Sequence, residues 1–224
     1  MLKVLFAPLV PENLLQAPRA QFQNISELAA AAKVSVMSAS RLVRQLRLEG
    51  FLDERDETLR LVRRKELLRR WQAVHLRGVS ELPLRWILPG KSGLPGALHA
   101  YCVEAEASRE PLPRACLALF AAAESLGFGF VHGVPPHFYF ESLNRDLLRR
   151  IGLSSEGAEQ KPEVYVRIPV FHESVFRGAI VQHGVPVSDI LQVWLDVGSH
   201  PAGGEAQAEE IRHRALAPLF EEER

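Results

Sequence analysis

Residues 25–53 read ISELAAAAKVSVMSASRLVRQLRLEGFLD, and their pattern predicts two short helices joined by a tight turn. The first helix is Ala-rich and spans Ser26–Ala32, and Lys33–Val34 forms the turn. Ser35 then caps the second helix, because its hydroxyl oxygen can accept from the free N–H groups of the first helical turn. Gly50 ends that helix, since glycine readily adopts the left-handed conformation that follows helix C-termini.

The second helix has two faces of different character. Apolar residues recur along it at spacings of three and four, which predicts one buried stripe. The stripe consists of Ala39, Val43 and Leu46, widened by Leu42. The opposite face carries hydroxyl, thioether, amide and guanidinium groups. A helix with such a face fits the major groove of DNA, where base edges present donors and acceptors.

Two short segments after Gly50 predict a β-hairpin. Residues 51–55 and 58–62 alternate or mix apolar and polar residues at strand spacing. Asp56-Glu57 forms the turn between them, although it lacks the glycine of the favoured hairpin turns. Helix, turn, helix and hairpin in this order predict a winged helix-turn-helix over residues 26–62. A protein-interaction module of the same shape is the alternative.

Charge separates along the chain although the total is zero. Residues 1–77 hold 14 Lys and Arg against 8 Asp and Glu, whereas residues 78–224 hold 13 against 19. The basic excess coincides with the helix-turn-helix and supplies the salt-dependent attraction to phosphate that DNA binding needs. Acidic residues lie among these arginines, so a solvated surface of ion pairs is the alternative. The residues that we expect to contact DNA are Ser35, Met37, Ser38, Arg41, Arg44, Gln45, Arg47, Arg55 and Arg60.

Length and composition limit the other classes of function. A chain of 224 residues with 47% hydrophobic residues allows one large domain or two small ones. No apolar run approaches the roughly 20 residues that span a bilayer. The apolar start is short and broken by prolines, so we expect no signal peptide, no membrane association and a cytoplasmic location. Cys102 and Cys116 are too few and too far apart for a zinc site, and we expect two buried, reduced thiols.

We place a domain boundary near residue 80, because three prolines and four glycines punctuate residues 78–96. Residues 1–79 then form the winged helix-turn-helix domain with an exit helix. Residues 80–224 form a mixed α/β domain, so the fold class is α+β. The helices expected in the second domain are 113–126, 143–151, 189–197 capped by Ser188, and 204–220. The expected strands are 84–88, 128–131, 137–140 and 163–168.

Catalytic and metal-binding motifs are incomplete in this sequence. Gly90-Lys-Ser92 resembles the end of a phosphate loop, but Arg85 stands where that loop needs a glycine. Asp189 and Asp196 can share a helix face, and a helix cap and a surface position explain them without chemistry. Five histidines that could meet at a metal are more simply surface and core residues. They are His132, His137, His172, His183 and His200. We therefore expect no catalytic residue, no metal and no cofactor.

Four segments of the second half carry a resemblance to a known family. They are residues 116–124 (CLALFAAAE), 164–166 (VYV), 188–196 (SDILQVWLD) and 200–209 (HPAGGEAQAE). With the winged helix they span most of residues 26–211, and the whole chain resembles the AbiEi family. That family comprises the antitoxins of abortive-infection type IV toxin–antitoxin systems and related transcriptional regulators.

The resemblance implies a repressor of its own operon that binds double-stranded DNA and is functionally linked to a nucleotidyltransferase toxin. It also implies a second domain similar to a nucleotidyltransferase fold without catalytic residues. The chain agrees with that loss, since it lacks a Gly-Ser followed by a paired Asp-x-Asp. It departs from the family at Gly203, where related sequences tend to carry Arg, which leaves the antitoxin role open.

The sequence therefore predicts a sequence-specific DNA-binding transcriptional regulator. Two alternatives stay open. Residues 80–224 could sense a nucleotide or a metabolite or act as a nucleotidyltransferase-like enzyme, or the chain could be a protein-interaction adaptor. The operator, the existence of a cognate toxin and the oligomeric state are also open, a homodimer being one option.

Overall fold

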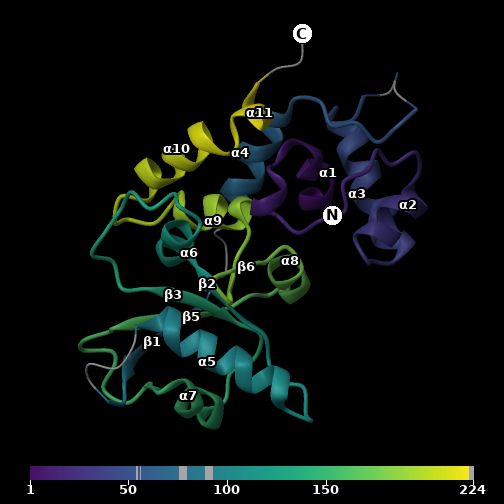
Figure 1. The fold of residues 1–224 in the computed structure, drawn as a ribbon. Helices are drawn as coiled ribbons and strands as arrows, with labels where there is room; N and C mark the ends of the chain where they lie inside the picture. The colour runs from purple at the N-terminus through teal and green to yellow at the C-terminus, as the bar shows by residue number, and fades with distance from the viewer. Residues whose placement is uncertain (54, 56, 76–79, 89–92, 222–224) are drawn as a thin grey trace.

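The computed structural model describes residues 1–53, 55, 57–75, 80–88 and 93–221. These residues form an α+β fold, as expected, in which helices cover both faces of one seven-stranded mixed sheet (Figure 1). No helix in this part of the chain combines the length and the apolar character that a membrane span requires.

The sheet has the strand order β4-β1-β5-β3-β2-β7-β6. The strands are β1 (Ser80–Trp86), β2 (Ala115–Ala118), β3 (His137–Phe140), β4 (Leu153–Ser154), β5 (Val164–Ile168), β6 (Ile180–Gln182) and β7 (Val185–Val187). β3 is parallel to β5 and β2 is parallel to β7, whereas the other neighbouring pairs are antiparallel. The central strands β2 and β3 are buried at every residue, because both faces of the sheet are covered.

Helices form layers on the two sides of the sheet. They are α1 (Leu2–Phe6), α2 (Ile25–Ala31), α3 (Val36–Leu48), α4 (Arg64–His75), α5 (Leu94–Ala107), α6 (Leu119–Ser125), α7 (Arg145–Ile151), α8 (His172–Phe176), α9 (Ile190–Val197), α10 (Gly204–Arg214) and α11 (Ala217–Phe220). α5 and α7 lie on one face, and α6 and α9 on the other (Figure 1). α9 also contacts α4 and α10, and for that reason all its residues are buried.

The N-terminal segment is joined to the rest of the chain by apolar and polar contacts. Phe6 of α1 stacks on Trp71 of α4 with ring centroids 6.2 Å apart. Lys3 of α1 forms an ion pair with Asp189, which precedes α9. Figure 1 shows α1 and α4 between α9 and the outlying pair α2 and α3. Residues 76–79, beside the expected domain boundary, lie outside the described residues, and the boundary stays a prediction.

Several elements differ from the expected ones. The helix expected over residues 113–126 is wrong in its first half: β2 occupies residues 115–118, and α6 begins at Leu119, whose φ is 47°. Residues 115–123 are rich in Ala and Leu and carry no charge, and such a run fits a buried strand as well as a buried helix, so periodicity cannot separate them. The strand expected over residues 128–131 is absent from this described segment, and the helix expected over 204–220 divides into α10 and α11.

The strand expected over residues 84–88 begins four residues earlier, since β1 occupies residues 80–86, whereas four other elements are confirmed within a residue or two. β3 and β5 lie where the aromatic and alternating patterns place them. α7 ends at Gly152, which has a φ of 84°. The cap of α9 is Asp189 rather than Ser188, since the Asp189 side chain accepts from the N–H of Gln192.

Candidate nucleic-acid interface and buried polar network

The turn between α2 and α3 has the geometry of a capped helix end. Lys33 adopts a left-handed conformation with a φ of 50°, which is unusual for a residue with a side chain. The N–H of Val34 donates to the carbonyl of Ala29 at 3.0 Å, the six-to-one bond of a Schellman cap. The turn therefore lies where the sequence predicted it, and α2 occupies residues 25–31 instead of 26–32.

Both ends of α3 are set by the residues that the sequence singled out. The hydroxyl of Ser35 accepts from the N–H of Ser38 at 3.1 Å, as an N-cap does. At the other end Gly50 has a φ of 69°, and the N–H of Phe51 donates to the carbonyl of Leu46 at 2.8 Å. Glycine adopts this conformation without the cost that a β-carbon imposes.

The two faces of α3 are separated as expected. Ala39, Val43 and Leu46 are buried. The expected DNA-contacting residues of this helix and its cap are all exposed: Ser35, Met37, Ser38, Arg41, Arg44, Gln45 and Arg47. Among the described residues, the guanidinium groups of Arg44 and Arg47 have no hydrogen-bond or ion-pair partner. The long basic side chains of α3 are thus available to a ligand.

The expected hairpin is shorter than predicted. Leu52 and Leu61 form one isolated antiparallel bridge, and the N–H of Asp53 donates to the carbonyl of Arg60 at 3.0 Å. Both leucines are buried, so the two arms are held by packing as well as by these bonds. Arg55 and Arg60 are exposed, as expected. The predicted turn at 56–57 includes residue 56, which lies outside the described residues.

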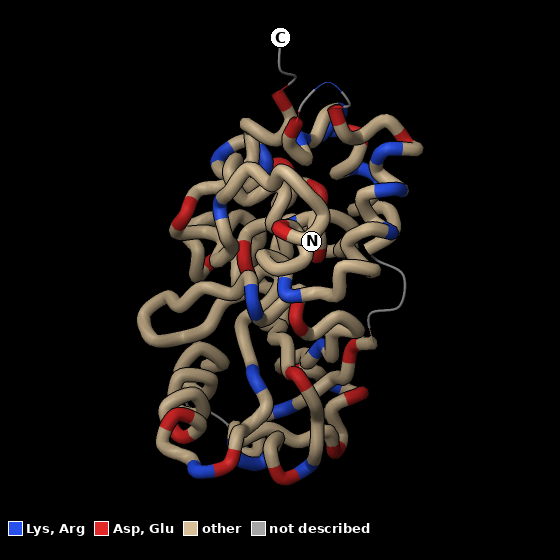
Figure 2. The backbone as a smooth tube through the Cα atoms, turned by 90° about the vertical axis from the view of Figure 1, so that its right-hand side faces the viewer, with Lys and Arg blue, Asp and Glu red and all other residues tan. Residues whose placement is uncertain are grey.

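Part of the basic cluster has a structural role. Arg63 and Arg70 lie over the ring of Phe51 at 5.1 and 4.9 Å from its centroid. Arg70 also pairs with Glu49 at 3.0 Å and with Glu66 at 2.8 Å. The hydrogen bond from Arg63 lowers the pKa of Glu66 below its ordinary value, and the charge of Arg70 adds to this. Figure 2 shows basic and acidic positions interspersed on the face in view. For Arg63 and Arg70 the ion-pair alternative therefore holds.

A second polar cluster is buried where α9 meets the sheet and α4. Asp196 is 1% exposed, so its expected surface position is wrong. The hydroxyl of Tyr139 lies 2.9 Å from both carboxylate oxygens of Asp196, and Nε2 of His75 lies 2.7 Å from one of them. The side-chain amide of Gln192 donates to the same oxygen at 3.0 Å. A buried carboxylate needs such partners, because burial without them costs several kcal/mol.

The cluster continues to the first helix of the chain. Nζ of Lys3 lies 2.6 Å from Asp189 and donates to the side-chain oxygen of Gln192 at 2.9 Å and to the carbonyl of Ser174 at 2.7 Å. Each of the three N–H donors of the Lys3 ammonium group therefore has an acceptor. Lys3, Asp189 and Gln192 are buried, so this contact fixes α1 against the start of α9.

Charged groups of the sheet extend the same cluster toward the surface. Nε of Arg167 donates to Glu81 at 2.6 Å, and Nε2 of His137 lies 3.7 Å from the same carboxylate oxygen. Burial, together with the charge of Arg167, lowers the pKa of His137 to about 4. The ring of His137 stacks on Tyr165 and lies 5.7 Å from the ring of His200. This imidazole is therefore neutral at pH 7.

Metal-ligating and thiol groups show no arranged site in the described residues. No three His, Cys, Asp or Glu side chains there could hold a metal ion together. Cys116 is buried as expected, whereas Cys102 is half-buried instead of buried, and burial raises the pKa of both thiols. Thiols of raised pKa are poor nucleophiles at neutral pH.

Sequence reasoning identified the faces of α3 but missed most of the buried polar network. One signal was present: Asp189, Gln192 and Asp196 interrupt an apolar helix at spacings of three and four, which places them on one side. Their partners come from α1, α4 and β3, far away in the sequence, and no local pattern indicates those. The chain matches no protein-family model, no curated protein and no solved structure.

Proposed function

We propose that this protein is a sequence-specific DNA-binding transcriptional regulator in which residues 25–62 act as a winged helix-turn-helix. The observation that carries the proposal is the division of α3 into two faces. One face is fixed by buried Ala39, Val43 and Leu46. The other presents exposed polar and basic side chains, two of them arginines without a partner among the described residues.

The chemistry of the exposed face favours nucleic acid over a mere solvated surface. Helices that only face water usually carry acidic and basic residues at spacings of three and four. α3 contains no Asp or Glu between Val36 and Leu48, so its three arginines have no counter-charge on their own helix. Guanidinium groups can bind guanine or phosphate through two hydrogen bonds, and hydroxyl and amide groups can read other base edges.

The roles of individual residues follow from their position on α3. Ser38, Arg41 and Gln45 face the base edges in this proposal, and Arg44 and Arg47 lie nearer to phosphate. The amide of Gln45 donates to Glu49 in the free protein, so it exchanges that partner for a base on binding. Arg55 and Arg60 of the following segment contact the flanking backbone.

The sequence resemblance to the AbiEi family adds a finer proposal. Proteins similar to that family repress their own operon and act beside a nucleotidyltransferase toxin. For this chain we propose autorepression, with the sheet domain as a nucleotidyltransferase-like module that has a regulatory role. The resemblance supports this finer statement, whereas the faces of α3 support DNA binding itself.

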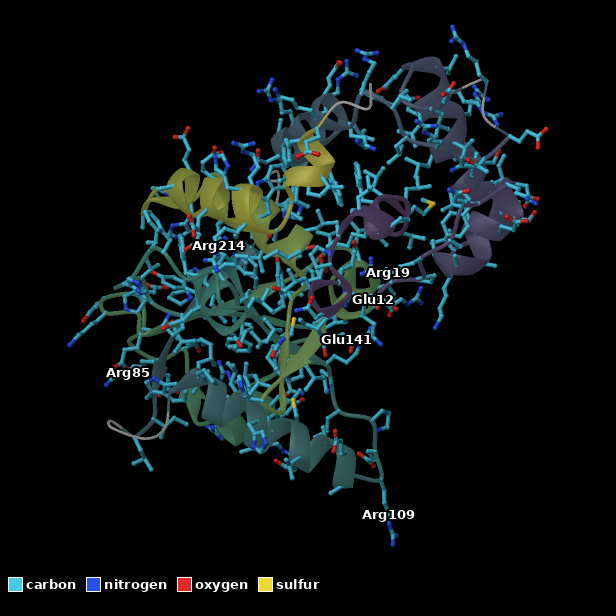
Figure 3. The ribbon with its side chains drawn as sticks, turned by 45° about the horizontal axis from the view of Figure 1, so that its top comes forward. Glu12, Arg19, Arg85, Arg109, Glu141 and Arg214 are labelled. Atoms are coloured by element: carbon cyan, nitrogen blue, oxygen red, sulfur yellow. The ribbon has the colours of Figure 1, made fainter. Side chains whose placement is uncertain are left out.

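Selection of DNA from a random duplex pool, followed by affinity measurements with the full chain, tests the proposal. Arg41→Ala should weaken binding to the best selected duplex by about 1–3 kcal/mol and relax the preference at one base pair. Arg109→Ala is the matched control, since Arg109 lies two residues after α5, far from α3 (Figure 3). Equal affinities of the wild type and Arg41→Ala would reject the assignment, and a pool without enriched sequences would reject specific DNA binding.

A further inference from the structure

Arg177, directly after α8, contacts the turn between α2 and α3. Its guanidinium group donates to the carbonyl of Ala32 at 3.2 Å and to that of Lys33 at 3.3 Å. More than 140 residues separate Arg177 from the turn, so this contact joins the two halves of the chain. The contact ends at Lys33, two residues before Ser35, the N-cap of α3.

The two carbonyl groups are natural acceptors for a cation. Ala32 is the C-cap of α2 and Lys33 follows it, so both carbonyls lie at the helix end that carries the negative end of the dipole. Lys33 also holds a left-handed conformation that residues with side chains adopt at a cost of roughly 1–2 kcal/mol. A guanidinium group bound to Ala32 and Lys33 stabilises this conformation and with it the direction in which α3 leaves the turn.

Arg177 is itself held by a chain of ion pairs. Glu173 of α8 pairs with Arg177 and, at 2.6 Å, with Arg114. Arg114 binds Glu141 through two nitrogens at 2.7 and 3.1 Å. Hydrogen bonds from Arg114 lower the pKa of Glu141 and of Glu173, so both carboxylates stay ionised at neutral pH. Glu141 follows β3 and is labelled in Figure 3, so the chain of pairs runs from the sheet to the turn.

Gly178, which follows Arg177, holds the backbone in place after α8. The carbonyl of Gly178 accepts from the N–H of Gln16 at 3.1 Å. A β-carbon on Gly178 would lie 2.4 Å from Oδ2 of Asp189, so the close approach requires glycine. Asp189 is locked by its ion pair with Lys3. The backbone after α8 therefore contacts both the N-terminal segment and Asp189, directly before α9. These contacts hold the backbone of Arg177 in place, and its side chain extends from there to the turn.

We propose that Arg177 is a positioning residue for DNA binding, which sets the orientation of α3 relative to the sheet. This inference rests on the proposed function of α3. Under this proposal, the sheet domain controls the affinity for DNA through three consecutive ion pairs, which link Glu141, Arg114, Glu173 and Arg177 in that order. Arg177 does not touch DNA in this proposal; it acts through the carbonyls of Ala32 and Lys33.

The test compares Arg177→Gln and Arg177→Lys with Arg214→Gln in the full chain. Arg214 is the matched control, because it pairs with Glu210 four residues before it, as Arg177 pairs with Glu173, and lies on α10. Hydrogen exchange of peptides covering residues 28–40 should rise in Arg177→Gln alone. Affinity for the selected duplex should fall about tenfold in that variant, with partial rescue by Arg177→Lys.

Two further results separate the possible explanations. The log–log dependence of affinity on salt should keep the wild-type slope in Arg177→Gln, whereas loss of a direct phosphate contact would reduce it by about 0.9 and overturn the positioning role. Unchanged hydrogen exchange at residues 28–40 would also overturn it, even where α3 binds DNA. If exchange rises but the wild type binds no selected duplex, the proposed function fails and the role in DNA binding fails with it.

Discussion

The hydroxyl of Tyr139 on β3 lies 2.9 Å from each carboxylate oxygen of Asp196 on α9. Both side chains are buried, and burial together with the charge of Asp196 raises the pKa of Tyr139 well above its ordinary value. The phenol therefore stays protonated and keeps donating to the carboxylate. His75 of α4 contacts the same carboxylate, so Asp196 joins the sheet, α9 and the helix that follows the proposed winged helix.

Tyr139→Phe should destabilise the protein by about 1–3 kcal/mol, because a buried carboxylate loses a hydrogen-bond donor without gaining water. Urea denaturation followed by circular dichroism measures the change. Tyr165→Phe is the control: this ring is half-buried, and its hydroxyl has no partner among the described residues. Equal destabilisation by the two substitutions would show that the hydroxyl of Tyr139 contributes nothing specific.

Leu46 and Leu48 offer a matched pair on α3. Leu46 is buried, whereas Leu48 is 74% exposed two residues further along the same helix. Leu46→Ala should destabilise by roughly 2–5 kcal/mol, because it leaves a cavity in the core. Leu48→Ala and Arg44→Ala should each stay within about 0.5 kcal/mol of the wild type. Thermal melts that reverse this order would contradict the observed register of α3.

The contrast between α3 and α9 shows what the sequence could and could not predict. The ends and faces of α3 follow from local chemistry: Ser35 caps it, Gly50 ends it and the apolar spacing selects its buried side. The burial of Asp196 depends on Tyr139 and His75, which are 57 and 121 residues away in the sequence. Such pairings arise only when the sheet and α4 assemble around α9, so no local pattern predicts them.

The error over residues 113–126 has a related cause. The uncharged, small and apolar residues 115–123 are compatible with a buried strand and with a buried helix equally. The choice is made by the partners of β2, since β3 and β7 bind its backbone from both sides. The position of Arg177 beside the turn after α2 is likewise tertiary, and the basic composition of residues 1–77 gave no hint of it.

Stability should fall as the pH is lowered from about 6.5 toward 4, and His137 should account for part of the fall. Burial first, and the charge of Arg167 second, lower the pKa of His137 from 6.5 to about 4 in the folded protein. Within that window the unfolded chain binds more protons than the folded one, so acid favours unfolding. The pKa difference corresponds to on the order of 3 kcal/mol.

The measurement is urea denaturation of the wild type and His137→Gln at pH 7, 5.5 and 4.5. The loss of stability with falling pH should be smaller in His137→Gln. His132→Gln is the control, since His132 is exposed, and it should follow the wild type. A profile of His137→Gln that parallels the wild type would show that other groups cause the acid sensitivity.

Lys33→Gly should stabilise the protein by about 0.5–1 kcal/mol. The φ of Lys33 is 50°, and glycine adopts this conformation without a clash of its β-carbon, which outweighs the greater freedom of glycine in the unfolded chain. Lys33→Ala removes the same charge but keeps the β-carbon, so it should gain no stability. Chemical denaturation of both variants measures the difference, and a loss of stability in Lys33→Gly would mean that the turn tolerates the side chain without strain.

The salt dependence of DNA binding should separate the free arginines from the paired ones. Arg47 has no partner among the described residues, whereas Arg70 pairs with Glu49 and Glu66 and lies over Phe51. Each phosphate contact contributes about −0.9 to the log–log slope of affinity against salt. Arg47→Ala should therefore make the slope less steep by about 0.9, because the variant neutralises one phosphate fewer than the wild type and releases correspondingly fewer counterions. Arg70→Ala should leave the slope unchanged and lower the free energy of unfolding instead, because the guanidinium group of Arg70 stabilises the folded protein through its contacts with Glu49, Glu66 and Phe51.

Titration of the selected duplex at several salt concentrations gives both slopes. If the two variants change the slope equally, the arginines act as a diffuse positive field, and the proposed assignment of Arg47 to a phosphate contact is wrong.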